Sequence, residues 1–385
     1  MIRSALRRGK VIASLTAASL ALTAATAGAA APHWRTVPPP ALPAGDSGDL
    51  FGVSMAGPSD GWAVGVRFAN KGSQKFRPFA AHWDGHRWQA ATLPAGLPVV
   101  RLNGVAALSA SDAWAVGGAP FASATPNVPL ILHWNGHRWA VVPSAPVPKV
   151  GFAELLGVAA HSPADVWAVG DAEHPKSGRD QTVIEHWDGH RWSLVPSPNL
   201  GHGSFLTGVT TTSTGGAWAV GGSLTTTGPF VLRWTGHTWV TAPTPRTSAD
   251  VNLESVTAVS PAQVWAVGEA ASGSSPSRPY ALRWNGHTWA SVTVPNPGPA
   301  QDGRKLISVA AAGHGQVDAV GYDDARAGPR LLHASWDGHR WSVTLGPPGG
   351  TALFAIAGDG GQLLAVGLKG VAHTTAFLPF TQVSP

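Results

Sequence analysis

An all-β fold is predicted for this chain of 385 residues. Three observations predict it. Glycine and proline are abundant, at 47 and 33 residues, the same short motifs return about every fifty residues, and the apolar runs between turn residues are too short for amphipathic helices. Charged residues make up 12% of the chain and hydrophobic residues 44%, which excludes a disordered protein. The repeat then specifies the architecture.

Each repeat contains four candidate strands. An apolar segment such as Gly104–Leu108 comes first, then Trp-Ala-Val-Gly, then a run such as Leu130–Trp134, and after a turn a second aromatic run such as Arg138–Pro143. Residues typical of strands dominate these runs. Four antiparallel strands with a period near fifty residues are typical of one blade of a β-propeller. The Trp-Ala-Val-Gly motif begins at Trp62, Trp114, Trp167, Trp218 and Trp265.

The third and fourth strands are joined by Asp-Gly or Asn-Gly, a strong signal for a tight hairpin. We expect a two-residue type I′ turn, because Asn, Asp and Gly tolerate the positive φ angles that it needs. In the second repeat such a turn sets Trp134 opposite His137 and His133 opposite Arg138. The two histidines then point to opposite faces, so we interpret them as polar residues beside a turn and expect no metal site.

Seven blades are predicted. The last repeat has only three strands before the chain ends, namely Phe354–Ile356, Leu364–Gly367 and Ala376–Leu378. The segment His33–Pro38 resembles the fourth-strand segment Arg191–Pro196, so the N-terminal strand is expected to complete the seventh blade and close the ring. The predicted propeller spans residues 32–385 as a single domain. Its blades start near Asp49, Arg101, Glu154, Phe205, Asn252, Lys305 and Ala352.

Tryptophan is abundant, and three recurring positions account for all 18 residues. One tryptophan opens the second strand of five blades, one closes the third strand of six, and one lies on the fourth strand of seven. A fixed position in successive blades indicates packing between blades, and each buried tryptophan contributes on the order of 3 kcal/mol before the entropy cost. Aromatic platforms for a ligand are the alternative interpretation.

The repeat resembles that of the kelch and galactose-oxidase-like propellers. The best match runs from Ala113–Gly118 through Leu130–Trp139 to Val142 and Pro143, with a strand ending in two glycines, an aromatic-ended strand, a turn, a tryptophan and a proline exit. The double glycine is complete in only two repeats. The Trp-Asp-Gly-His-Arg-Trp turn is also similar to repeats of some bacterial propeller lectins and to the aspartate box of sialidases. The resemblance covers residues 32–385 and implies the propeller fold, which carries lectins, adaptors and enzymes alike.

Residues 1–31 have the layout of a secretory signal. Four basic residues lie in the first ten positions, an apolar run from Val11 to Ala27 follows, and Ala-x-Ala cleavage patterns extend to Ala31. We therefore expect a secreted or cell-envelope protein with no membrane span after removal of this segment. The remaining chain has 22 basic and 21 acidic residues, so no basic surface for nucleic acid is expected.

No catalytic residues are predicted. The chain has no cysteine, which excludes disulfides, thiol nucleophiles and the Tyr–Cys copper centre of galactose-oxidase-like enzymes. Common serine-hydrolase, zinc-protease and nucleotide-binding motifs are absent from the sequence. A sialidase-like site needs a tyrosine nucleophile, an acidic partner and three arginines, and Tyr280 and Tyr322 come with no such signature. No cofactor is expected.

The connections differ at the two ends of a blade. The turns between strands one and two and between three and four are short and repetitive, whereas the other connections are long and individual. Both long connections lie at the same end of an antiparallel blade, and loops generally carry function. The predicted ligand-binding residues are Asp49, Arg101, Glu154, Asn252 and Lys305 at the mouth of the central channel, and Arg67, Arg179, Tyr322 and Asp323 on the loop side. The alternative is that these residues are solvated strand ends that pair with one another.

Asp318 departs from the repeat, because it occupies a position where five blades have tryptophan. We expect its charge to be solvated at a strand end, and a ligand carboxylate is the alternative. Leu364 takes the same position in the seventh blade, so blades six and seven are expected to be the least tightly packed.

These observations favour a secreted, monomeric, non-catalytic binding module. It would present the loop side and the channel mouth to an extracellular glycan or to a protein partner of the cell envelope. Two alternatives stay open: a hydrolase or lyase that acts on polysaccharide, and a scaffold for protein–protein interaction that takes no small ligand.

Overall fold

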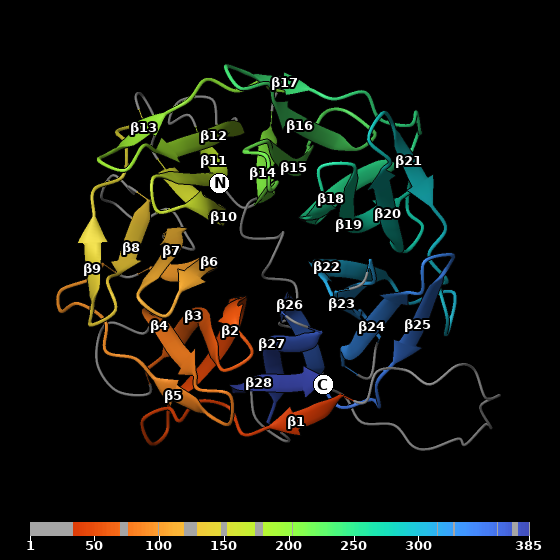
Figure 1. The fold of residues 1–385 in the computed structure, drawn as a ribbon. Helices are drawn as coiled ribbons and strands as arrows, with labels where there is room; N and C mark the ends of the chain where they lie inside the picture. Colours follow the sequence, from red (N-terminus) through yellow and green to blue (C-terminus); the bar gives the residue numbers. More distant parts are fainter. Residues whose placement is uncertain are drawn as a thin grey trace.

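The computed structural model describes residues 34–69, 76–98, 100–118, 129–147, 152–173, 180–201, 203–313, 315–325, 328–359, 361–371 and 376–384. Seven four-stranded antiparallel sheets surround a common axis, as Figure 1 shows. The predicted all-β, seven-bladed propeller is confirmed. The expected signal segment, residues 1–31, lies outside the described residues, and so does Arg179.

In each blade the first strand is nearest the axis and the fourth is outermost (Figure 1). The first strands are β2 (Ser47–Gly57), β6 (Arg101–Ser109), β10 (Phe152–Ser162), β14 (Ser204–Thr211), β18 (Asp250–Ser260), β22 (Arg304–Ala311) and β26 (Thr351–Asp359). The second strands are β3 (Asp60–Phe68), β7 (Asp112–Gly118), β11 (Asp165–Glu173), β15 (Ala217–Ser223), β19 (Gln263–Ala271), β23 (Val317–Asp323) and β27 (Gln362–Gly370). The third strands are β4 (Phe76–Trp83), β8 (Leu130–Trp134), β12 (Asp180–Trp187), β16 (Phe230–Trp234), β20 (Arg278–Trp284), β24 (Arg330–Trp336) and β28 (Phe377–Ser384). The fourth strands are β5 (Trp88–Ala90), β9 (Trp139–Val142), β13 (Trp192–Leu194), β17 (Trp239–Thr241), β21 (Trp289–Val292), β25 (Trp341–Leu345) and, in the seventh blade, β1 (Arg35–Val37).

The antiparallel order gives the ring two different ends. The turns that join strands one and two, and three and four, lie at one end, which we name the turn face. The connections between strands two and three, and from one blade to the next, lie at the other end, which we name the loop face. Each first strand therefore begins at the loop face, beside the axis.

The N-terminal strand closes the ring as predicted. It pairs antiparallel with β28, with Arg35 opposite Val383 and Val37 opposite Thr381. The hydroxyl of Thr381 also donates a hydrogen bond to the carbonyl of Val37 over 2.9 Å. The third strand of this blade, β28, continues to Ser384, whereas the sequence predicts a strand that ends at Leu378. It is longer because it pairs with β27 along its whole length, and its last residues pair with β1.

The turn between the third and fourth strands is wider than predicted. Trp134 lies opposite Trp139, not His137, so four residues form the loop. The side-chain oxygen of Asn135 accepts hydrogen bonds from the amides of His137 and Arg138 at 3.1 and 3.0 Å. The glycine that follows has a φ of 87°. The expected type I′ turn is wrong, because the Asn or Asp side chain caps backbone amides of a longer loop.

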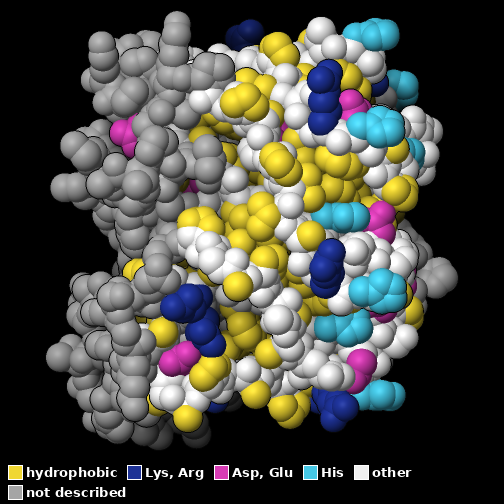
Figure 2. All heavy atoms as spheres, turned by 90° about the vertical axis from the view of Figure 1, so that its left-hand side faces the viewer, with side chains coloured by type: hydrophobic (Ala, Val, Ile, Leu, Met, Phe, Trp, Pro, Cys, Tyr) yellow, Lys and Arg dark blue, Asp and Glu magenta, His cyan; other side chains and the backbone are white. Residues whose placement is uncertain are grey.

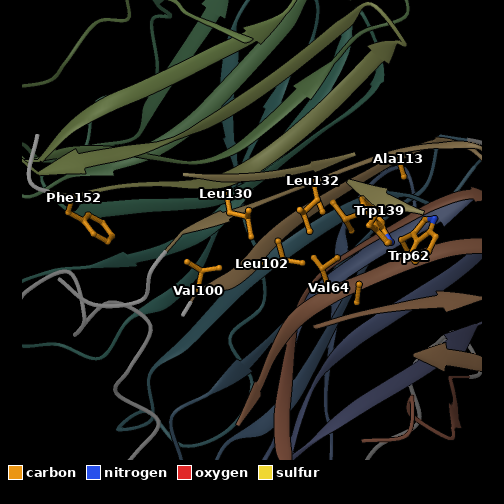
Figure 3. Packing of buried hydrophobic residues seen from close by; sticks show 12 residues of the cluster. Trp62, Val64, Val100, Leu102, Ala113, Leu130, Leu132, Trp139 and Phe152 are labelled. Atoms are coloured by element: carbon orange, nitrogen blue, oxygen red, sulfur yellow. The ribbon is translucent and has the colours of Figure 1, made fainter. Parts of the chain in front are cut away.

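The hydrophobic core lies between blades. Trp62 of the first blade meets Trp139 of the second edge-on, with ring centroids 4.9 Å apart, and is also 4.9 Å from Trp134. Val64 and Leu102 pack beside them, and Figure 3 shows this seam. The same arrangement joins the next four pairs of blades, starting from Trp114, Trp167, Trp218 and Trp265.

The seam between the sixth and seventh blades lacks this aromatic triad. Asp318 is buried and accepts a hydrogen bond from Ser335, which lies directly opposite on β24. The expectation that Asp318 is solvated is therefore wrong, because the neighbouring strand supplies its partner. Burial raises the pKa of this carboxyl. Nearby, Trp34 stacks on His333, whose Nε2 lies 3.1 Å from the side-chain oxygen of Gln382. Polar contacts thus take the place of the aromatic triad at the seam between the sixth and seventh blades.

Candidate functional site

Every first strand carries a β-bulge at the same place. The register with the second strand skips one residue after a leucine, as between Leu50 and Gly52 of β2. Bulges re-aim side chains and are frequent beside binding sites. In the sequence each bulge is a leucine followed two positions later by Gly, Ser or Ala. The skipped residues are Phe51, Asn103, Leu156, Thr207, Glu254, Ile307 and Phe354.

The small residue after each bulge lets neighbouring inner strands approach each other closely. A Cβ atom on Gly52 would lie 3.0 Å from the carbonyl oxygen of Asn103 and 3.1 Å from the Cα of Gly104 in the next blade. Where serine replaces glycine it bridges the strands, since Ser308 Oγ accepts a hydrogen bond from the amide of Ile356 over 3.1 Å. The first strands therefore form a tight ring around the axis (Figure 1).

Five side chains from four consecutive blades form a continuous arc, which we name the axial arc. Lys305 Nζ lies 5.4 Å from the ring centroid of Tyr322, and that ring meets Phe354 edge-on with centroids 6.0 Å apart. Phe354 is 5.7 Å from Phe51, and the guanidinium carbon of Arg101 is 5.7 Å from the Phe51 ring centroid. Both cations are within range of a cation–π contact. Phe51 and Phe354 are half-buried, so part of each ring is accessible.

A carboxylate holds the cation at each end of the axial arc. Arg101 Nη2 lies 3.4 Å from Glu154 Oε2, and the carboxamide of Asn103 donates to the same oxygen over 3.5 Å. At the other end Lys305 Nζ lies 3.4 Å from Glu269 Oε2. The paired side chains are only 10 to 17% exposed, so water and salt screen these pairs less than surface pairs.

Burial and neighbouring charges set the protonation of Lys305 and Tyr322. Burial raises the pKa of the Tyr322 phenol to about 12, so the phenol stays protonated near neutral pH. Burial alone would lower the pKa of the Lys305 ammonium, but the charges of Tyr322, once ionised, and of nearby carboxylates outweigh it and hold that pKa above its ordinary value. These carboxylates belong to Glu269, Asp324 and Glu254. The arc therefore keeps a neutral phenol beside a charged ammonium.

Asp49 and Asn252 occupy the matching position on other inner strands. Asp49 is 8% exposed, and its Oδ1 has no hydrogen-bond partner among the described residues. Burial raises its pKa to about 7. A buried carboxyl oxygen without a partner costs stability, and carboxyls with shifted pKa values concentrate at functional sites. Asn252 is half-buried and lies over Gly222, where an added Cβ would come within 2.5 Å of its Oδ1.

The structure brings together four of the predicted site residues, Arg101 with Glu154 and Lys305 with Tyr322. Tyr322 lies within β23 and is buried, rather than on a loop. Arg67, near the end of β3, pairs with Asp46, at 3.4 Å between Nε and Oδ2. The phenylalanines of the arc were missed by sequence reasoning, although the Leu-x-small repeat marks their positions.

Asp323 is fully buried and belongs to a separate ion-pair network. It pairs with Arg330, whose guanidinium also lies 3.6 Å from Asp302 Oδ2. The fully buried Arg304 donates hydrogen bonds to the carbonyls of Pro299 and Asp302 at 2.8 and 3.2 Å. These contacts hold the connection before the sixth blade against β22 and β24, which gives Asp323 a stabilising contact within the fold.

The arrangement is suited to binding. Ring faces offer apolar surface, and paired charges offer donors and acceptors side by side. Within the described ranges, no three His, Asp or Glu side chains are placed to hold a metal ion. The described part of the chain also has no helix that is long and apolar enough to cross a membrane.

Comparisons with known proteins find similar folds among solved structures but no match in sequence. No family model and no curated protein matches the sequence. A structure of YCF48 bound to a D1 peptide matches with a TM-score of 0.55 and 16% identity, over 91% of this chain and 97% of that one. YCF48 from Cyanidioschyzon merolae matches with a TM-score of 0.54 and 18% identity, over 91% and 99%. A structure of YjhT covers 70% of this chain and 94% of its own at 10% identity, with a TM-score of 0.42. The likeness to known propellers is thus one of fold.

Proposed function

We propose that the protein is an exported, non-catalytic module that binds a glycan at the axial arc. The observation that carries this proposal is the arc itself, in which the half-buried rings of Phe51 and Phe354 lie between two cations. Each cation is already paired with a carboxylate, Arg101 with Glu154 and Lys305 with Glu269.

A sugar ring matches this combination. It has an apolar face of C–H groups and a rim of hydroxyls that donate and accept hydrogen bonds. The phenylalanine rings supply the flat apolar surface, and the ion pairs supply donors and acceptors within reach of the rim. Because the carboxylates neutralise both cations, the arc has no excess positive charge to select an anionic ligand. A neutral glycan is therefore the ligand class that it fits best.

A peptide segment of an envelope protein is the second candidate. The observation that favours it is the YCF48 structure, in which a propeller of similar fold is bound to a peptide. An aromatic side chain and a peptide group could use the same rings and ion pairs. It stays second because that likeness extends to the fold and not to the residues of the arc.

Export rests on residues 1–31, with their basic start, apolar run and small residues at Ala27, Ala29 and Ala31. Expression of the full chain in a bacterial host tests it. We expect the protein outside the cytoplasm, with an N-terminus at or just after one of these alanines. A full-length protein retained in the cytoplasm would contradict export and leave the binding proposal to its own test.

Binding is tested by a glycan array and a peptide library, followed by calorimetry with the best ligand. The double variant F51A/F354A removes both accessible rings of the arc. The control F68A/F76A removes another half-buried aromatic pair, from β3 and β4, with centroids 5.1 Å apart. We expect the arc variant to bind a glycan on the order of tenfold more weakly or worse, and the control to bind normally.

Other outcomes separate the alternatives. If peptides bind and glycans do not, and the arc variant loses peptide binding, the second candidate replaces the first. If the ligand binds equally to both variants and to the unaltered protein, the site is elsewhere. Mass spectrometry of the glycan after incubation tests for cleavage, and shortened chains would contradict a non-catalytic module.

A further inference from the structure

The turn face carries a repeated histidine that the proposed function does not use. In each of the first six blades, the loop between the third and fourth strands has histidine as its third residue. All six side chains are exposed. Figure 2 shows histidines gathered along the right-hand edge of the molecule, among arginines and acidic residues. We name the six histidines at the third position of these loops the turn-tip histidines. They are His86, His137, His190, His237, His287 and His339.

The geometry of the loop does not require histidine. In five loops the histidine contributes its backbone amide, which donates to the Asp or Asn side chain over 2.8 to 3.1 Å. In the fourth blade Thr235 replaces the Asp or Asn, and the amide of Thr238 donates to its hydroxyl over 3.1 Å. His237 still occupies the same position there. None of the hydrogen bonds in these loops involves an imidazole ring of a turn-tip histidine. Loop geometry therefore does not explain why histidine recurs, and we attribute the recurrence to the chemistry of the exposed side chain.

The histidines one position before the last tryptophan of the third strand do make hydrogen bonds through their rings. His133 is partly buried, stacks on Trp114 with centroids 4.2 Å apart, and lies 2.9 Å from Asp112 through Nε2. His82 and His186 have matching partners, Asp60 and Asp165, at 2.6 and 2.8 Å. These three histidines have a structural explanation within their blades. The turn-tip histidines do not.

Exposed arginines follow four of the turn-tip histidines, and aspartates precede three of them. Hydrogen bonds from the loop amides hold the pKa of Asp84, Asp188 and Asp337 below its usual range, so these carboxylates stay charged in mild acid. The arginines are Arg87, Arg138, Arg191 and Arg340. Other charged or titratable groups toward the same face are Arg35, His161, Arg233, Arg283 and Asp359, besides the three His–Asp pairs.

Protonation therefore changes the charge of the loop tips strongly. Four arginines against three aspartates leave one net positive charge with the histidines neutral. Protonation of the six histidines adds six more, and histidine as a residue type changes charge between pH 5 and 8. Hence a rim that is nearly neutral with the histidines neutral is strongly cationic once they are protonated.

We propose that the turn face binds an anionic polysaccharide and binds it more tightly in mildly acidic medium. The cationic tips come one in each of six consecutive blades, so a flexible chain with regularly spaced carboxylate, sulfate or phosphate groups contacts several at once and gains by multivalency. A lipid surface fits less well, because the tips consist of Gly, Asp, Asn or Thr, His and Arg or Thr. The flanking tryptophans of the fourth strands are buried, and those of the third strands are buried or half-buried. This surface lies at the opposite end of the ring from the start of the first strands, so the inference is independent of the axial arc.

Binding of dextran sulfate and polygalacturonate to the immobilised full-length mature protein tests the proposal, with neutral dextran as the reference polymer. We expect the anionic polymers to bind at pH 5.5 on the order of tenfold more tightly than at pH 7.5 and less tightly in salt, whereas dextran should show no such dependence on pH or salt. The sixfold histidine-to-glutamine variant H86Q/H137Q/H190Q/H237Q/H287Q/H339Q should bind at pH 5.5 as weakly as the unaltered protein does at pH 7.5. The control H82Q/H133Q/H186Q should keep its pH dependence, and circular dichroism establishes that both variants are folded.

Equal binding at the two pH values, or unchanged binding by the sixfold variant, would overturn the proposal. Anionic phosphatidylglycerol vesicles form a further arm. Binding to vesicles as tight as to the polymers would replace the polysaccharide by a membrane surface and so contradict the assignment. Because this test scores only the pH-dependent binding of anionic polymers and the turn-tip variant, its failure leaves glycan binding at the axial arc unaffected.

Discussion

Trp34, just before the N-terminal strand, stacks on His333 of the sixth blade, with ring centroids 4.5 Å apart and an angle of 31° between the rings. Trp34 precedes the strand that completes the seventh blade, and His333 lies on β24 of the sixth, so the two residues meet at the seam between these blades. Gln382, on the strand that pairs with β1, supplies the hydrogen-bond partner of the imidazole. The seam between the sixth and seventh blades thus contains a buried histidine in place of the aromatic triad that joins each pair of neighbouring blades from the first to the sixth.

The stability of the protein should depend on pH through His333. Burial lowers the pKa of His333 to about 4, whereas an unfolded histidine titrates near 6.5. The unfolded chain therefore takes up a proton that the folded protein excludes, so the stabilisation is complete above pH 6.5 and is lost as the pH falls toward 4. The loss amounts to about 3 kcal/mol. H333Q keeps an amide partner for Gln382 and does not titrate.

Thermal unfolding of the unaltered protein and H333Q between pH 7.5 and 4 measures this effect. We expect the difference in free energy of unfolding to shift in favour of H333Q as the pH falls. The same slope in both proteins would show that His333 does not control acid stability.

Asp49 gives a prediction of opposite sign. Burial raises its pKa to about 7, so the folded protein holds this proton more tightly than the unfolded chain. The carboxyl costs nothing below its unfolded pKa near 3.8, and the cost grows as the pH rises toward 7, to about 4 kcal/mol at most. D49N should therefore stabilise the protein at pH 8 and leave it unchanged near pH 3.5. The exposed D250N is the control, and a gain that does not depend on pH would contradict the argument.

The seventh blade suggests a stabilising pair of substitutions in the sixth. Asp318 lies opposite Ser335, and at the matching positions of the seventh blade Leu364 lies opposite Val383. Replacing the buried polar pair by this apolar pair in D318L/S335V should raise the free energy of unfolding by about 1–3 kcal/mol at neutral pH. Denaturant titration measures the change. The single variant D318L should gain less, because it leaves the Ser335 hydroxyl without its partner, and a destabilised double variant would refute the assignment.

The tryptophan seams should dominate stability. Trp62 is 2% exposed and contacts two tryptophans of the next blade, so W62A should lower the free energy of unfolding by about 3–5 kcal/mol. Trp34 is half-buried, and W34A should cost clearly less. Denaturant curves of the two variants test this order. Equal losses of unfolding free energy in W62A and W34A would contradict the expectation that the more buried tryptophan stabilises the protein more.

Much of the fold is readable from the sequence because a propeller repeats its signals. The Trp-Ala-Val-Gly strand, the aromatic-ended third strand and the leftover N-terminal strand predict four strands per blade and the closure onto β28. The hairpin loop was misjudged for a physical reason. Asp-Gly and Asn-Gly suit a type I′ turn, but here the loop has four residues and the side chain of Asn135 accepts hydrogen bonds from two of its backbone amides.

The site was harder to predict, since its residues depend on contacts between blades. The position of Arg101 and Lys305 at the start of inner strands follows from the repeat count. The role of Phe51 and Phe354 does not, because only the bulge turns them toward their neighbours in other blades. Asp323 looked available as a charged residue near a loop, yet Arg330 buries it in an ion pair.

Glycan binding at the axial arc is best tested by a crystal structure of the protein with the glycan selected from the array. We expect a sugar ring against Phe51 and Phe354, with hydroxyls in hydrogen bonds to the Arg101–Glu154 and Lys305–Glu269 pairs. A glycan bound elsewhere, with the axial arc uncovered, would contradict it.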